Sequence, residues 1–169
     1  MPDFEEALTD GDAEILKLAL SLQQKVTHPN VHWALLNTSE EVVNRFEIIV
    51  DEFPQRYVGI ASFPVQRYSG NNLREGCSMI PHRRSFVHME VVFWDKGPVV
   101  AKLEAEIILK YSDKLENRYK SKEGEKNMPM SLYFCYNTLA EAEEYRRSHR
   151  KRFMEKHCEV VKKIRRQGF

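Results

Sequence analysis

The chain has 169 residues, of which 42% are hydrophobic and 30% charged, a balance that predicts one folded domain with elaborations and argues against a disordered chain. No apolar run is long enough to span a membrane, and the acidic start, Met1 to Glu6, lacks the basic-then-apolar order of a signal peptide. The three cysteines have no CxxC spacing. They therefore predict reduced thiols in an intracellular protein, nuclear or cytoplasmic, rather than a disulfide framework or a zinc site.

The net charge of +1 hides a gradient along the chain. Acidic residues predominate up to Arg56, whereas basic residues, Arg147 and Lys151 among them, outnumber acids from Thr138 onward. This asymmetry predicts a basic tail that can contact an anionic partner such as nucleic acid. A solvated helix face with ion pairs one turn apart explains the same run of charges.

The first third of the chain is predicted to be helical with one strand. Apolar residues at helical spacing indicate a helix from about Asp12 to Val26, and a strand is expected at Val31 to Leu36. Thr38 or Ser39 then caps a helix that Pro54 ends, because apolar residues fall on one face of it. Propensity alone would make 46–50 a strand, since that stretch is rich in β-branched residues.

The remaining elements alternate between strands and helices. In chain order, we expect a strand at 57–61, a short helix after Pro64, a polar loop with a basic tip at 82–84 and a strand at 88–94. A helix from 99 to about 111, an exposed loop at 115–127 and a strand at 130–136 follow. A Thr138–Glu141 capping box then begins a long helix. The pattern predicts an α/β (α+β) fold with a small central sheet flanked by helices. We expect residues 1–54 to form a helical N-terminal extension packed on the core, 55–137 the core, and 138–169 a basic C-terminal helix.

A tyrosine–glycine strand followed by an arginine is the most informative motif in the chain. Tyr57-Val58-Gly59 begins a buried strand, and Arg67 follows that strand after a proline. Glu104 lies in a later helix and precedes an apolar pair, Ile107 and Ile108, with Glu106 as the alternative acid. Asn117 follows that helix. In this order the residues resemble the GIY-YIG nuclease domain over roughly Tyr57 to Tyr136.

The resemblance implies a metal-dependent endonuclease that hydrolyses phosphodiester bonds, with DNA favoured over RNA. Glu104 would hold Mg²⁺ or Mn²⁺ mostly through water, and Arg67 would contact the phosphate. Tyr57 is the candidate for helping to deprotonate the attacking water, and Asn117 would orient groups without charge. Arg83 and Arg84 in the loop, with Arg147 and Lys151 in the last helix, are the predicted contacts to the nucleic-acid backbone.

The sequence departs from the family pattern where the first signature, Gly-Ile-Tyr, should precede Tyr57. One interpretation makes Val31 to Leu36 that strand, which would place His32 or Trp33 at the position of the family tyrosine. Otherwise the element is missing, which favours a catalytically inactive nucleic-acid-binding or protein-interaction module on the same scaffold. The acidic front and basic tail also suit pairing between copies of the chain, so a homo-oligomer is considered.

Overall fold

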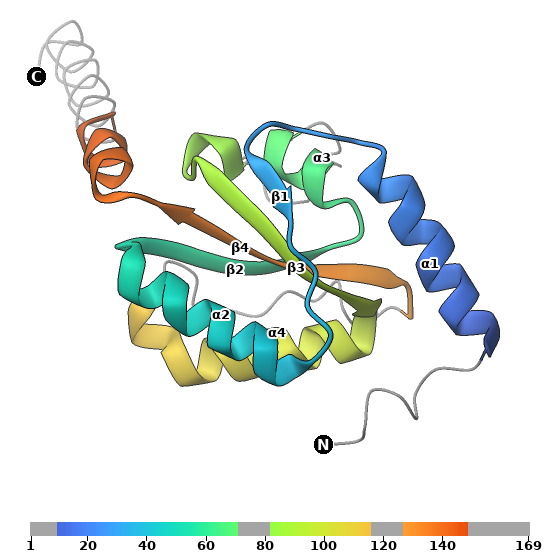
Figure 1. The fold of residues 1–169 in the computed structure, drawn as a ribbon. Helices are drawn as coiled ribbons and strands as arrows, with labels where there is room; N and C mark the ends of the chain where they lie inside the picture. Colours follow the sequence, from blue (N-terminus) through green and yellow to red (C-terminus); the bar gives the residue numbers. More distant parts are fainter. Residues whose placement is uncertain (1–9, 71–81, 116–126, 149–169) are drawn as a thin grey trace, which may run out of the picture.

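A four-stranded sheet forms the centre of the protein in a computed structural model that describes residues 10–70, 82–115 and 127–148 (Figure 1). The strands are β1 (Val31–Trp33), β2 (Gln55–Ala61), β3 (His88–Lys96) and β4 (Pro129–Asn137), in the order β1-β3-β4-β2. β1 runs parallel to β3, and the other neighbours are antiparallel. The mixed sheet with flanking helices confirms the predicted α/β fold class.

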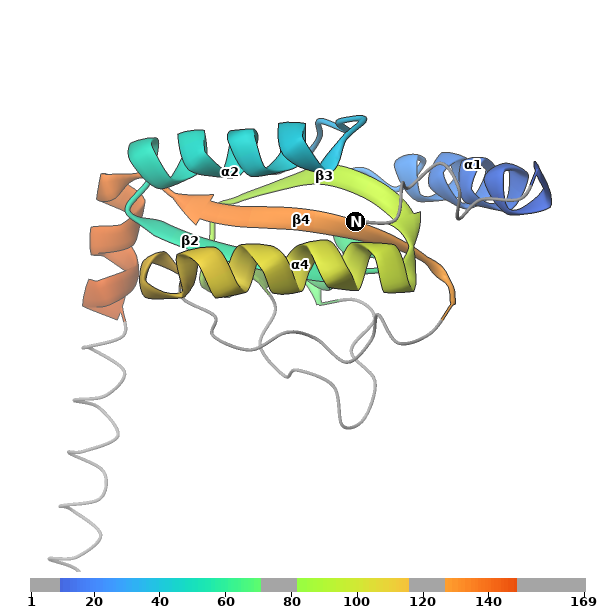
Figure 2. The ribbon, with the colours of Figure 1, turned by 90° about the horizontal axis from the view of Figure 1, so that it is seen from below.

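Two helices, α2 (Ser39–Glu52) and α4 (Gly97–Tyr111), cover one face of the sheet (Figures 1 and 2). Thr38 caps α2, because its Oγ1 accepts a hydrogen bond from the backbone N–H of Glu41 at 3.1 Å. Buried side chains of both helices pack against β2, β3 and β4, with Phe46 at the centre of this apolar face. The helical period therefore prevails over the β-propensity of residues 46–50.

The opposite face carries a smaller core with more polar groups. The short helix α3 (Pro64–Ser69) and a 3₁₀ turn (His82–Arg84) lie over it. The buried members of this core are Val31, Ala61, Val65, Tyr68, Phe86, Met89, Val91, Tyr133 and Cys135. Because Pro64 stands in the first turn of α3, it sets the start of the helix that carries Arg67.

The helix α1 (Asp10–Gln24) lies to the side of the sheet (Figure 1). The indole Nε1 of Trp94 donates to the carbonyl of Leu16 at 2.9 Å, and Lys96 forms an ion pair with Asp12 at 2.6 Å. These contacts attach α1 to the end of β3. None of the helices in the described ranges is both long and apolar enough to cross a membrane.

Candidate functional site

The pairing of β2 with β4 places Gly59 opposite Tyr133. A Cβ atom on Gly59 would lie 2.6 Å from Cζ of Tyr133 and 2.9 Å from a ring carbon of Tyr57. No real side chain tolerates such contacts, and here the obstacle is two packed rings. Glycine is therefore required because a tyrosine from the neighbouring strand lies over the backbone, a reason that the motif alone does not give.

Tyr57, His82 and Tyr133 form one aromatic cluster on this face. The His82 ring centroid lies 4.8 Å from that of Tyr57 and 5.4 Å from that of Tyr133. His82 Nε2 and the Tyr133 hydroxyl are 2.7 Å apart, which is hydrogen-bond distance. A histidine and two tyrosines, contributed by three separate segments, thus share a single site.

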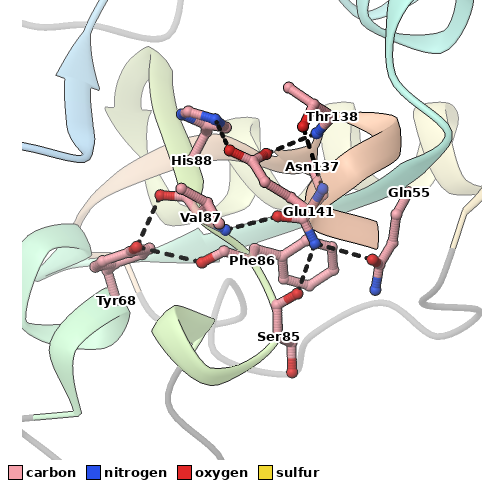
Figure 3. A network of polar contacts seen from close by, with 9 residues as sticks. All are labelled: Gln55, Tyr68, Ser85, Phe86, Val87, His88, Asn137, Thr138 and Glu141. Atoms are coloured by element: carbon pink, nitrogen blue, oxygen red, sulfur yellow. Dashed lines mark hydrogen bonds and ion pairs between the residues drawn. The ribbon is translucent and has the colours of Figure 1, made fainter. Parts of the chain in front are cut away.

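The segment that carries His82 is held by side chains from α3 and β4 (Figure 3). The Tyr68 hydroxyl donates to the carbonyl of Val87 at 2.8 Å. Asn137 accepts from the N–H of Val87 at 2.7 Å and donates to the carbonyl of Ser85 at 2.8 Å. Because the N–H of Ser85 donates in turn to the carbonyl of His82 at 3.0 Å, these bonds fix the imidazole against Tyr133.

The capping box after β4 extends the same network (Figure 3). The Glu141 carboxylate accepts from the N–H of Thr138 at 2.7 Å, and Thr138 Oγ1 accepts from the N–H of Glu141 at 3.3 Å. His88 contacts the same carboxylate at 2.9 Å. The predicted capping box is confirmed, and it ties the helical turns at 139–148 to β3.

The electrostatics of Tyr133 show what surrounds it. Burial raises the pKa of its phenol well above the usual value, and the charges of Tyr57 and Glu104 raise it further, whereas Arg67 opposes them. Arg67 and Glu104 therefore lie within electrostatic reach of one hydroxyl. Of the predicted site residues, Tyr57 contacts the ring of Tyr133, whereas Arg67 and Glu104 act on its hydroxyl only through their charges.

His82 is neutral at physiological pH. Burial, and then the charge of Arg67, lower the pKa of its imidazole to about 4. Since the raised pKa of Tyr133 keeps its phenol protonated, the pair consists of a neutral histidine and a neutral tyrosine. Burial thus keeps both members of the pair uncharged.

Sequence reasoning missed both His82 and Tyr133 as site residues. His82 was expected at the exposed tip of a basic loop, but it is only 9% exposed. Tyr133 was expected only as a core side chain, and it is indeed 2% exposed. The available signal was Ser131-Leu132-Tyr133, an apolar strand segment that ends in tyrosine, which resembles the missing signature but stands late in the chain.

The interpretation of Val31 to Leu36 as the partner strand of β2 is wrong. β1 pairs with β3, and β2 pairs with β4. His32 and Trp33 lie opposite Glu90 and Val91 of β3, so neither stands beside Tyr57. The residue on the strand next to Tyr57 is Cys135, and Tyr133 follows two positions away on the same face.

Of the four predicted contacts to the nucleic-acid backbone, the structure describes the side chains of Arg83 and Arg147. Arg83 is exposed beside buried His82, and the structure describes only the backbone of Arg84. Arg147 lies after β4, 72% exposed and 3.3 Å from Glu144. Asn117 and Lys151 lie outside the described residues.

The oxygen donors at the cluster are of the kind that Mg²⁺ or Mn²⁺ prefers. Glu104 supplies a carboxylate, and Mg²⁺ commonly takes one or two carboxylates while water and substrate phosphate complete its shell. Within the described ranges no three His, Cys, Asp or Glu side chains form a metal-binding group. Glu104 itself is 1% exposed, and among the described residues it belongs to no complete set of metal ligands.

No protein-family model matches this chain, and no curated protein or solved structure matches it either. The resemblance to GIY-YIG nucleases therefore rests on the motif residues alone.

Proposed function

We propose that the protein is a metal-dependent endonuclease of GIY-YIG type that hydrolyses phosphodiester bonds in nucleic acid, with DNA favoured, inside the cell. The observation that supports this most is the meeting of two tyrosines on antiparallel strands. Tyr57 and Tyr133 stack with ring centroids 6.4 Å apart, and Arg67 and Glu104 act electrostatically on the second of them. An arginine, a carboxylate and proton-transferring groups are the parts that phosphodiester hydrolysis needs.

In this proposal, Ser131-Leu132-Tyr133 takes the place of the first signature. The family has that strand before the Tyr-Val-Gly strand, whereas here it follows the glutamate helix. Its antiparallel pairing with β2 supports the equivalence, because Ser131 lies opposite Ala61 and Tyr133 opposite Gly59. The element that seemed missing is thus assigned to the other end of the core.

Arg67 and the His82–Tyr133 pair have separate roles in the proposed reaction. Arg67 binds a non-bridging phosphate oxygen through its guanidinium N–H groups. A water oxygen attacks phosphorus, its proton passes to the tyrosine–histidine pair, and the bond to the leaving oxygen breaks while that oxygen takes a proton from solvent. Glu104 would hold the metal ion, which as a Lewis acid stabilises negative charge on the phosphate and the leaving oxygen.

Burial of the site has a consequence for its turnover. Glu104 is 1% exposed and Tyr133 is 2% exposed. Side chains above them must therefore move before a phosphate can reach either group. Opening of this kind often limits the rate of an enzyme. We expect slow turnover, and metal binding that is weak until nucleic acid is present.

Cleavage assays with matched carboxylates on one helix test the proposal. Labelled DNA and RNA are incubated with Mg²⁺ or Mn²⁺ and with wild type, Arg67→Ala, Glu104→Gln or Glu106→Gln. Glu106 is exposed on the same helix, so its variant is the control. We expect Arg67→Ala and Glu104→Gln each to slow cleavage by about a hundredfold or more, and Glu106→Gln to leave it unchanged. Equal activity in all four proteins would contradict the site assignment.

A non-catalytic nucleic-acid-binding module is the second candidate, and the burial of Glu104 favours it. This candidate predicts that the protein binds DNA or RNA with an affinity that falls steeply as the salt concentration rises, and that no added metal ion leads to cleavage. In that case Glu104→Gln would leave binding unchanged, because a carboxylate turned toward the protein interior contacts no phosphate. Cleavage that Glu104→Gln abolishes would reject this candidate.

A further inference from the structure

An apolar stripe on α1 faces away from the sheet. Ile15, Leu18 and Leu22 are 57%, 64% and 52% exposed, and Val26, just after the helix, is 37% exposed. Their spacing puts them on one side of the helix. The other side holds Leu16, only 8% exposed, and the contacts to β3. α1 is therefore apolar on two sides, of which only one packs against the described part of this chain.

The charges along the stripe have opposite signs at its two ends. Glu14 stands beside Ile15 at the start, and Lys25 follows Leu22 at the end. Both side chains are exposed, and within the described part of the chain neither makes an ion pair. A second copy of α1 in parallel would set Glu14 against Glu14 and Lys25 against Lys25. An antiparallel copy would set each acid against a base.

We propose that α1 binds α1 of a second copy of this chain in antiparallel orientation, forming a symmetric homodimer. Leu18 of one copy lies beside Leu22 of the other, and Ile15 lies beside the stem of Lys25. Glu14 of each copy then pairs with Lys25 of the other. The antiparallel helix dipoles also favour this orientation. The inference does not depend on the proposed nuclease activity.

The size of the stripe sets the strength of the dimer. Stable interfaces bury about 800 Å² on each partner, which is more than three or four side chains of one helix supply. The association is therefore weak and depends on protein concentration. This dependence is what the experiment measures.

Sedimentation velocity of the full chain tests the dimer over about a hundredfold range of concentration. We expect the weight-average sedimentation coefficient of wild type to rise with concentration and that of Leu18→Glu to stay at the monomer value. Leu109→Glu is the matched control, because Leu109 is 83% exposed on α4 and lies outside the stripe. A wild type that stays monomeric, or equal effects of the two glutamates, would overturn the proposal.

Charge reversal tests the orientation. Glu14→Lys and Lys25→Glu should each raise the dissociation constant by about tenfold, since each replaces two attractive pairs by two repulsive ones. The double variant should recover wild-type association, and the differences should shrink at high salt. Failure of the double variant to recover would overturn the antiparallel arrangement. Circular dichroism of each variant checks that α1 remains helical.

Discussion

The two faces of the sheet differ in how their aromatic residues are used. On the face covered by α2 and α4, Phe46 packs against Tyr111 and Phe134 with both ring-centroid distances at 5.0 Å. On the other face, the rings of Tyr57 and Tyr133 carry hydroxyl groups beside a histidine and within reach of the charges of Arg67 and Glu104. The aromatic rings of the first face pack on one another, whereas those of the second carry hydroxyl groups beside a histidine.

The polar groups on the first face show that burial of a hydroxyl is not itself a sign of function. Tyr136 donates to Glu90 at 3.3 Å, and Arg45 contacts the same carboxylate through two bonds, at 2.7 and 2.8 Å. Every charged group in this cluster has a partner of opposite charge, so the arrangement satisfies itself. The cluster around Tyr133 differs in that it joins neutral groups to the charges of Arg67 and Glu104, which come from different elements.

The largest expected effect is on the packed face. Phe46→Ala removes a ring that is 0% exposed and should lower the free energy of unfolding by about 3 to 5 kcal/mol, because a cavity replaces its contacts. Urea unfolding followed by tryptophan fluorescence measures this loss. A change below about 1 kcal/mol would show that the two helices do not hold the fold as the packing indicates.

A matched pair of tyrosines separates packing from chemistry. Tyr133→Phe should slow nucleic-acid cleavage by about a hundredfold or more, since it removes a proton-transferring hydroxyl. Tyr136→Phe removes a buried hydroxyl on the opposite face and should leave cleavage unchanged. Both variants should lose about 1 to 3 kcal/mol of unfolding free energy, because each leaves a partner with fewer hydrogen bonds.

The contrast between the two variants is the informative quantity. Equal cleavage rates for Tyr133→Phe and Tyr136→Phe, measured at a temperature at which both remain folded, would remove the functional distinction between the faces. A loss of cleavage confined to Tyr133→Phe would place the chemistry on the face of α3.

His82 should make stability depend on pH. Its pKa is lowered to about 4 in the folded protein, whereas an unfolded histidine titrates near 6.5. The unfolded chain therefore binds more protons between these values. The stabilisation is fully present above about pH 6.5 and is lost progressively as the pH falls toward 4, by about 1.4 kcal/mol for each pH unit.

Comparison of wild type with His82→Gln isolates this contribution. The groups that face the imidazole are Arg67, Tyr57 and Tyr133; arginine and tyrosine do not titrate in this pH range, so the difference in slope belongs to His82. Urea unfolding at a series of pH values supplies both slopes. Parallel curves for the two proteins would mean that His82 is not buried in a neutral form.

The sequence predicts where the helices and strands of this fold lie better than it predicts which strands pair. The apolar period of α2 and the proline of α3 act locally, so their boundaries follow from residues nearby. The pairing of β2 with β4 joins residues 70 to 82 positions apart, and no local pattern encodes it. The strand beside Tyr57 was therefore sought before it in the chain, where β1 stands, and not after it.

The missed site residues have the same physical cause. From Met130 onward β4 is buried on both faces, so it lacks the alternation that would mark Tyr133 as facing β2 and α3. His82 is drawn inward by bonds that Tyr68 and Asn137 make to the segment after it. Arg67 and Glu104 were selected from the order of short motifs, whereas the positions of His82 and Tyr133 depend on tertiary structure.

The smallest effect is expected at Arg147, away from both faces of the sheet. Its guanidinium is 72% exposed and lies 3.3 Å from the carboxylate of Glu144, one helical turn earlier. Exposed pairs of this kind contribute about 0 to 1 kcal/mol. Arg147→Ala should therefore leave the free energy of unfolding unchanged within about 0.5 kcal/mol.

A role for Arg147 in nucleic-acid binding would appear only in the salt dependence. If this side chain neutralises one phosphate, Arg147→Ala should reduce the slope of log affinity against log salt concentration by about one unit and weaken binding equally for all sequences. Glu144→Ala is the matched control, because it frees the same guanidinium and should leave that slope unchanged or raise it. An unaltered slope in Arg147→Ala would remove Arg147 from the predicted contacts to nucleic acid.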